Sequence, residues 1–433
     1  MIKYRPIQQI IIDTSKYTPT EEMEVLIVQY DDSKKDIWIP SSLTDFIVYK
    51  YSSCELNTKL TYAQYVCTFI NYLNQQVILG EDSCFEVLKR DGLYGLNHKH
   101  LEKYLNYISR KAEKVNSYDT VKRKEEVLLK FYSFLYKRGV TGEQAKIKRK
   151  LAPIKESTKS GSRGKYVLIS PFDNEENEDA NLKVFYPGKN VTNTKPILKD
   201  MDYDVWNQLI EFAEEKYPNI ALALTFQIMG GLRMGDLVNL TRESVSRYEN
   251  QKHIRLDIQN RQLDLFRGRN INLKKCQVKT ERINQPVFDF NGRLFEILDN
   301  HLEILNNTQN IKDMNALFVD SDGYAMSGDS YEKWYTRLKL EFIEFVGDEG
   351  HEKLAKKLKD HKWATHLGRH IFTNFLIKIG AVNTADGKPN PEYLRVLRGD
   401  KNASSCSTYI DEKAVIDTVI DKIGVISEMA SKL

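Results

Sequence analysis

Apolar residues recur along the chain with the spacing of amphipathic helices. Four of them in one early stretch stand at i, i+3, i+4 and i+7, namely Val66, Phe69, Ile70 and Leu73. This spacing places apolar side chains on one helix face. It returns at 101–108 and continues through 128–135. We therefore predict a compact helical domain over 49–155.

The segments on either side of this domain have other patterns. Residues 1–48 alternate short β-rich runs ("IQQIIID", "EVLIVQY", "DIWIP") with polar turns, which predicts a strand-containing N-terminal arm of unknown role. Residues 156–198 are polar with an acidic middle, which predicts a linker with a surface insertion. Helical spacing resumes over 199–433, where "HIRLDIQ", "RNINLKK" and "QPVFDF" predict strands between 253 and 290. The predicted fold class is mainly α with a small β-sheet.

The net charge of +4 is unevenly distributed. Between residues 101 and 165 eighteen Lys or Arg face seven Asp or Glu, so the rest of the chain carries an excess of negative charge. Such a basic segment is typical of a surface that follows phosphates, and a solvated helix face is the alternative. The candidate phosphate contacts are Lys111, Lys114, Lys122, Arg123 and Lys124.

Composition excludes several classes of protein. The most apolar stretch, 220–232, is shorter than a membrane span and contains a Gln, and the first residues have no run of signal-peptide length. The five cysteines are scattered without a CxxC pair, which argues against a disulfide framework and a thiolate zinc site. We expect a cytoplasmic protein with no membrane contact, no metal and no cofactor.

The stretch "MGGLRMGDL" is a candidate anion site. Gly230 and Gly231 precede a predicted helix that carries Arg233 at its start, where backbone N–H groups and a guanidinium could hold phosphate oxygens. An Arg233–Asp236 pair on a surface turn is the alternative.

A second candidate is the basic run "KKCQVKTERINQPVF". We interpret it as a hairpin whose tip projects the ammonium group of Lys279, with Lys274 and Lys275 as competing candidates and a solvated turn as the alternative.

The stretch "ATHLGRHIFTNFLIKIG" places His366, Arg369 and His370 at the start of an apolar helix. A zinc helix would carry a glutamate between ligands four apart, and "HLGRH" has none, although a metal held by the two histidines stays an alternative. Histidine and arginine on one helix face suit a phosphate under attack, because one group grips oxygens and the other moves a proton.

The stretch "LRGDKNASSCSTYIDEKAV" follows. Gly399 is predicted to end a helix, a polar turn comes next, and Tyr409 opens a final helix. The order G-L-R, a lysine, H-x-x-R-H, and L-x-G-x with a tyrosine nine residues later resembles the tyrosine recombinase (phage-type integrase) family over about 199–420. Matched position by position, the resemblance implies these catalytic and supporting residues: Arg233, Asp236, Lys279, His366, Arg369, His370, Asp400 and Tyr409.

The resemblance implies a fold and an activity. It implies a helical core-DNA-binding domain and a mixed α/β catalytic domain that form a C-shaped clamp on double-stranded DNA. Tyr409 would be the nucleophile of a site-specific recombinase, a mobile-element integrase or transposase, that works through a 3′-phosphotyrosyl intermediate without ATP or Mg²⁺. It also implies a homo-oligomer, a tetramer on DNA, with accessory DNA-bending or directionality proteins and a place at the nucleoid.

Two positions depart from the family pattern. Asp400 stands where the family has a histidine or tryptophan, and we expect its carboxylate to cap the following helix. Gly368 stands where an apolar residue is common, and we expect a looser turn there. The apolar stripe of the last helix, from Ile416 to Ile423, fits either an intramolecular core or a tail that docks on a neighbouring protomer.

Other interpretations of the same residues remain open. A type IB topoisomerase or a hairpin telomere resolvase would use the same five groups and differ in product. A DNA-binding relative without activity is the non-enzymatic alternative, and Asp400 is the feature that favours it.

Overall fold

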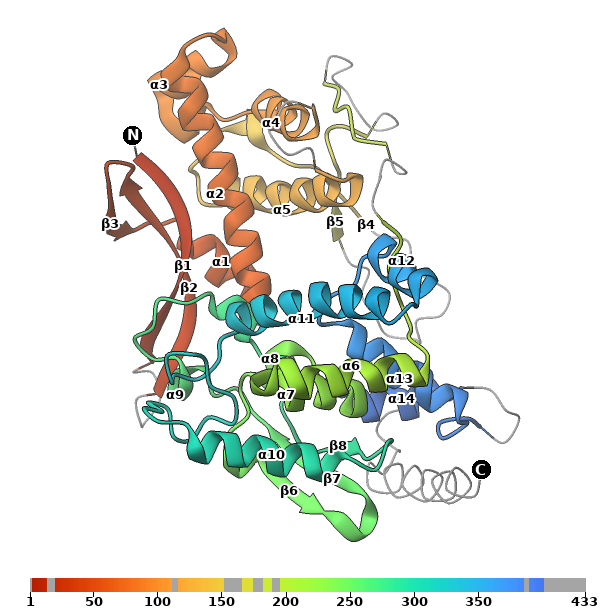
Figure 1. The fold of residues 1–433 in the computed structure, drawn as a ribbon. Helices are drawn as coiled ribbons and strands as arrows, with labels where there is room; N and C mark the ends of the chain where they lie inside the picture. Colours follow the sequence, from red (N-terminus) through yellow and green to blue (C-terminus); the bar gives the residue numbers. More distant parts are fainter. Residues whose placement is uncertain are drawn as a thin grey trace. The chain divides into compact units, whose positions relative to one another are not determined.

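A computed structural model describes residues 2–13, 20–110, 116–151, 166–173, 182–188, 195–384 and 389–400 (Figure 1). The fold is mainly α with small antiparallel sheets, which confirms the predicted fold class. The chain divides into two compact units, Met1–Asn193 and Thr194–Leu433. The finer boundaries at 48, 155 and 198 stay predictions. Lys111, Lys114, Tyr409 and the predicted C-terminal helix lie outside the described residues.

The first unit combines helices with two small sheets. Its described helices are α1 Thr44–Tyr51, α2 Leu56–Leu79, α3 Glu86–Asp91, α4 His98–Arg110 and α5 Tyr118–Lys137. Its described strands are β1 Ile2–Asp13, β2 Thr20–Asp31, β3 Lys34–Pro40, β4 Arg149–Leu151 and β5 Tyr166–Leu168. The apolar residues that set the predicted helical period are buried, from Val66 in α2 to Leu135 in α5.

The N-terminal strands form one antiparallel sheet in the order β1-β2-β3. Val25 and Ile27 of β2 are fully buried in the same core as Phe46 of α1. Tyr4 and Asn71 tie β1 to α2, because the Tyr4 N–H donates to the Asn71 amide oxygen and the Asn71 amide donates to the Tyr4 carbonyl, both at 2.8 Å. The arm predicted from the sequence is therefore built into the core of the helical unit.

Part of the polar segment after α5 also packs on the first unit. Phe172, Leu182 and Val184 are buried in its core. The buried Glu125 of α5 accepts hydrogen bonds from the Ser170 hydroxyl at 2.5 Å and the Tyr186 hydroxyl at 2.7 Å. Scattered apolar residues fix this segment, although its composition is that of a linker.

The second unit is built around a buried helix. Its described helices are α6 Tyr203–Lys216, α7 Pro218–Gly230, α8 Met234–Leu237, α9 Gln262–Leu265, α10 Leu294–Asn307, α11 Gly328–Asp348, α12 Glu352–Asp360, α13 Leu367–Lys378 and α14 Pro391–Arg398. Every residue of α7 from Ile220 to Gly230 is buried, as expected for a helix that is apolar on all sides. It contacts α6, α10, α13 and β8. None of the helices in the described ranges has the length and apolar character needed to cross a membrane.

The sheet of the second unit has the antiparallel order β6-β7-β8, with β6 Val245–Tyr248, β7 His253–Ile258 and β8 Arg282–Phe288. The predicted strand over 269–275 is wrong, since this segment forms turns and a single 3-10 turn, Leu273–Cys276. Side chains from 269 to 275 do alternate between half-buried and exposed, as a strand would. The N–H groups of Ile271, Leu273 and Lys275, however, donate to carbonyls two or three residues back, so the backbone forms tight turns and does not pair with a neighbouring strand. Lys279 therefore lies just before β8 and not at a hairpin tip.

Candidate active site

The guanidinium of Arg369 lies inside the second unit. The residue is 1% exposed and belongs to the first turn of α13. Its Nη1 donates to the carbonyls of Gly231 at 2.6 Å and Arg398 at 2.8 Å. These two carbonyls lie at the C-terminal ends of α7 and α14. Arg369 therefore connects the start of α13 to the ends of both helices.

Close packing of α13 on α7 places Arg369 there. A Cβ at Gly368 would lie 2.7 Å from Gln227 Cβ and 3.0 Å from its carbonyl carbon. The expectation that Gly368 loosens the turn is therefore wrong, because the missing side chain lets the two helices approach each other. Gly231 has a φ of +64° and ends α7, where a Cβ would meet the ring of Phe372 at 2.6 Å.

Arg233 follows this turn directly. The two glycines end α7, and Arg233 stands at the N-cap of α8, so a helix with Arg233 at its start does follow them as predicted. Anion binding at this helix start stays a prediction. The helix α8 is a single turn, and the Arg233 N–H already donates to Asp236 Oδ2 at 3.1 Å. The Arg233 side chain is directed to Asp400.

Asp400 lies between the two predicted arginines. Its Oδ1 accepts a hydrogen bond from Arg369 Nη2 at 2.5 Å and another from Arg233 Nη2. The side chain of Asp400 is 30% exposed. Opposite charges attract strongly where water is partly excluded, so the guanidinium groups hold this carboxylate. The helix that Asp400 was expected to cap lies outside the described residues, and that expectation stays a prediction.

Two backbone features fix the position of Asp400. Gly399 ends α14 with a φ of +61°, and a Cβ there would lie 2.3 Å from Arg282 Nε. The Asp400 N–H donates to the Arg395 carbonyl at 3.1 Å. Glycine at 399 suits both the left-handed conformation of this residue and the close approach of the Arg282 side chain.

Arg282 connects this turn to α8 and to the segment that carries Lys279. Its Nη2 donates to the fully buried Asp236 at 3.0 Å, and its Nη1 donates to the Thr280 carbonyl at 2.9 Å. A Cβ at Gly235 would lie 2.1 Å from the Gln277 carbonyl oxygen, so α8 lies directly against this segment. Asp236 thus binds both the Arg282 side chain and the Arg233 N–H, and its role as a supporting residue stays a prediction.

The lysines of this segment differ in their surroundings. Lys279 is exposed, and no hydrogen bond or ion pair within the described ranges holds its ammonium group. Lys275 is held by Asp329 at 2.6 Å and by Glu332, both on α11. These ion pairs remove Lys275 as a competitor of Lys279.

His366 and His370 stand beside the arginines. The two rings are nearly perpendicular, with centroids 5.2 Å apart. His366 keeps an exposed edge, and burial of the rest of its ring, followed by repulsion from His370, Arg369 and Arg233, lowers its pKa to about 4. Burial and the nearby Arg398 also lower the pKa of His370. Both imidazoles are neutral at pH 7, the state in which a histidine accepts a proton.

Arg369 keeps its charge at neutral pH. Burial and the charge of Arg233 lower the pKa of Arg369 to about 9, while the Asp400 carboxylate opposes this decrease. Within the described ranges, no group of three His, Cys, Asp or Glu side chains could hold a metal ion.

Sequence reasoning missed two residues of this site. Gln285 of β8 is 2% exposed and donates to the carbonyls of Gly230 at 3.1 Å and Leu397 at 2.7 Å, so it ties together the helix ends that present Arg233 and Asp400. Arg398 lies with its Nε 3.2 Å from Asp400 Oδ2. Arg398 directly precedes Gly399 and Asp400 in "LRGD", and this position could have indicated that it belongs to the site. Nothing in the sequence pattern indicated Gln285.

The predicted phosphate contacts of the first unit lie on α5. Lys122 forms an ion pair with the buried Glu125 at 3.1 Å and contacts the Tyr186 hydroxyl. Lys124 donates to the Asn116 side chain at 3.3 Å, and burial lowers its pKa. Arg123 is exposed. Lys122 and Lys124 are thus partly engaged inside their own unit.

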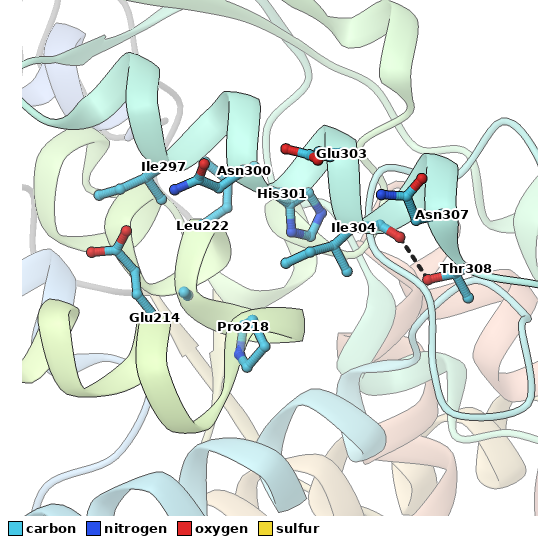
Figure 2. Close-up of a pocket in the computed structure, with 11 residues that line it drawn as sticks. Glu214, Pro218, Leu222, Ile297, Asn300, His301, Glu303, Ile304, Asn307 and Thr308 are labelled. Carbon is cyan, nitrogen blue, oxygen red and sulfur yellow. Dashed lines mark hydrogen bonds between the residues drawn. The ribbon is translucent and has the colours of Figure 1, made fainter.

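The second unit also has a cavity of about 580 Å³ between α6, α7 and α10. It is lined by Glu214, the buried His301 and neighbouring residues of these helices (Figure 2). His301 is fixed by a hydrogen bond to the Leu317 carbonyl at 2.8 Å. None of the predicted catalytic residues in the described ranges lines this cavity.

No protein-family model matches the sequence, and no curated protein matches it. Among solved structures, the chain is similar to the XerH site-specific recombinase bound to difH substrate, with a TM-score of 0.46, 14% identity and coverage of 91% of this chain and 85% of that chain. It is similar to the Tn1549 transposon integrase in complex with circular intermediate DNA, with a TM-score of 0.44, 14% identity and coverage of 84% and 97%.

It is also similar to a lambda integrase dimer bound to a core site, with a TM-score of 0.41, 12% identity and coverage of 86% and 95%. Each of these three proteins is named as a recombinase or an integrase.

Proposed function

We propose that this chain is a site-specific tyrosine recombinase that cuts and rejoins double-stranded DNA through a 3′-phosphotyrosyl intermediate. One observation supports the proposal most directly. Arg233 and Arg369, which come from segments far apart in the sequence, bring their guanidinium groups to the same carboxylate oxygen. A pair of guanidinium groups that meets one anionic oxygen suits the non-bridging oxygens of a phosphodiester.

The residues present divide the chemistry between them. Arg233 and Arg369 would hold the phosphate and stabilise the charge that builds up in the pentacoordinate transition state. The Tyr409 hydroxyl would attack phosphorus while His366, neutral at pH 7, accepts the phenolic proton. The bond from phosphorus to the 5′ oxygen breaks, and Lys279 would give this oxygen a proton.

Reversal of these steps completes the exchange. The 5′ hydroxyl of a second strand attacks the phosphotyrosine, returns a proton to Lys279 and releases Tyr409, which regains its proton from His366. The energy of the broken bond is kept in the covalent link, so no nucleotide cofactor is consumed. We propose mobile-element integration or transposition as the setting, a tetramer on DNA as the assembly, and the cytoplasm as the location.

The position of Asp400 favours a second candidate. A carboxylate that already occupies both arginines suits a DNA-binding relative that no longer cleaves. A type IB topoisomerase or a telomere resolvase would share the covalent step with the recombinase and would release relaxed circles or hairpin ends.

Covalent trapping tests the proposal. The protein is incubated in EDTA with nicked or supercoiled DNA that carries the sequences flanking its own gene, and then denatured with detergent. We expect a protein–DNA adduct that is lost in Tyr409→Phe and kept in Tyr203→Phe, a control at an exposed tyrosine of the same unit. DNA binding without an adduct would favour the non-cleaving relative, and the form of the rejoined DNA separates recombinase from topoisomerase.

A further inference from the structure

A third guanidinium group, that of Arg398, lies next to the Asp400 carboxylate. Arg233 and Arg369 bind its Oδ1, and Arg398 Nε lies 3.2 Å from its Oδ2. Each oxygen of the carboxylate thus faces at least one arginine. A carboxylate and a phosphodiester each carry one negative charge and present two oxygens to a planar donor, so arginines bind both in similar geometry.

The cluster has positive charge left after this pairing. Four guanidinium groups, those of Arg233, Arg282, Arg369 and Arg398, face two carboxylates, those of Asp236 and Asp400. Arg233 Nη1 is buried and has no hydrogen-bond partner within the described part of the chain. Buried donors without a partner are costly, so the cluster is suited to an anion that offers more acceptor oxygens than Asp400 does.

Arg398 is held in place by the same elements. It is the last residue of α14, and its carbonyl accepts the hydrogen bond from Arg369 Nη1 at 2.8 Å. Its side chain is 28% exposed, and its charge acts on both His366 and His370. The guanidinium of Arg398 therefore faces the predicted phosphate position from α14, as Arg369 does from α13.

We propose that Asp400 occupies the phosphate position of the site and that a DNA phosphate binds by displacing it, with Arg398 as a third phosphate-binding arginine. The inference rests on the proposed function and adds two things to it. Arg398 is a binding residue, and Asp400 opposes DNA binding until a well-placed phosphate competes for the three arginines.

Inorganic phosphate tests this inference without DNA cleavage. We compare the melting temperature of the full chain in phosphate and in chloride at equal ionic strength. Asp400→Asn is expected to gain about 2–4 °C when phosphate exceeds its Kd about tenfold, because binding to the native state stabilises it. The wild type should show little difference, and Arg398→Gln/Asp400→Asn should lose the gain. Asp299→Asn is the matched control, since Asp299 also pairs with an arginine of this unit, Arg247, outside the cluster.

DNA affinity gives a second measurement on the same variants. At fixed salt, Asp400→Asn should bind a DNA duplex about tenfold more tightly than the wild type, and Arg398→Gln about tenfold less tightly. The slope of log K against log salt should fall by about 0.9 in Arg398→Gln, the value for one lost phosphate contact. Arg247→Gln controls for the loss of a positive charge elsewhere in the unit.

Each outcome decides the inference. If Asp400→Asn and Asp400→Ala both fold and neither is stabilised by phosphate, Asp400 does not occupy a phosphate position. A phosphate effect that persists in Arg398→Gln/Asp400→Asn excludes Arg398 as a ligand. If the Asp400 variants do not fold, the DNA affinity of Arg398→Gln decides the inference. A loss of affinity no larger than that of Arg247→Gln contradicts it. A phosphate effect without any Tyr409-dependent adduct would retain the inference while the recombinase proposal fails.

Discussion

The two units of this protein carry their positive charge in different ways. On α5 of the first unit, Arg123 is exposed, whereas Lys122 is neutralised by the buried Glu125. In the second unit, Arg369 is 1% exposed, hydrogen-bonded to two backbone carbonyls, and directed at a carboxylate. Within the described part of the basic segment, Arg123 is thus on the surface, whereas Arg369 is enclosed at the start of an apolar helix.

The two units thus offer two ways to bind an anion: attraction by exposed charges in the first unit, and a fixed arrangement of donors in the second. Surface lysines attract a polyanion from a distance and are screened by salt. A buried arginine with three fixed acceptors has lost its rotamer freedom during folding, so it meets a phosphate with little further ordering. The predictions below test whether the two units respond differently to equivalent changes.

Replacement of Arg369 should have the largest effect. Arg369→Ala leaves the Gly231 and Arg398 carbonyls and part of Asp400 without donors, and we expect a loss of about 3–5 kcal/mol in the free energy of unfolding. Arg369→Lys keeps a charge but not the fork, and the rate of adduct formation should fall at least about 100-fold. Urea unfolding and covalent trapping measure the two effects. Arg123→Gln in the first unit should change stability by no more than about 0.5 kcal/mol, and a larger change would contradict the contrast.

Gly399→Ala should have the next largest effect. The new Cβ meets Arg282 in a left-handed conformation, so we expect a loss of about 2–3 kcal/mol and impaired adduct formation. Gly139→Ala is the matched control in the first unit. Gly139 has a φ of +69°, and none of the described atoms lies within 4 Å of the point that a Cβ would occupy there.

Thermal or urea unfolding of both glycine variants separates the two contributions. Gly139→Ala should lose only the conformational cost, about 1 kcal/mol. Equal losses in the two variants would show that the approach of Arg282 to Gly399 has no energetic role.

Changes on α5 should have a smaller effect, and mainly on DNA affinity. Arg123→Gln should lower the slope of log K against log salt by about 0.9 if Arg123 meets a phosphate. Lys122→Gln should leave this slope nearly unchanged and lower the stability of the first unit by about 1 kcal/mol, because it breaks the ion pair with Glu125. A DNA titration at several salt concentrations measures both slopes, and a reversed order of the two variants would contradict the structural role of Lys122.

The smallest effect concerns pH, because His366 is exposed and solvent weakens the influence of its neighbours. His366 has a folded-state pKa of about 4 against an ordinary value of 6.5, so the unfolded chain binds a proton in this range while the native chain does not. Stability should therefore fall as the pH decreases from 6.5 toward 4. His366→Asn should reduce this fall, as measured by the urea midpoints at pH 7 and pH 5. A variant with the same acid sensitivity as the wild type would show that His366 does not contribute.

The sequence alone determined much of the architecture. The helical period placed α2, α4 and α5, because a buried face requires apolar residues every three to four positions. The short β-rich runs at the start indicated the three strands of the N-terminal sheet. The order of the motifs indicated Arg233, Lys279, His366 and Arg369 as candidates. Each motif is a short stretch of neighbouring residues, so it can be found in the sequence alone.

Only the tertiary structure decided how these residues meet. The strand predicted over 269–275 is wrong although its side chains alternate in exposure, because its backbone N–H groups donate to carbonyls two or three residues back and not to a neighbouring strand. Likewise, nothing in the local sequence around Asp400 indicated that the ends of α7, α13 and α14 bring two arginines to its carboxylate. The attraction between two charges depends on the distance between them. For residues far apart in the sequence, helix packing sets this distance, and the local spacing of a motif carries no information about helix packing.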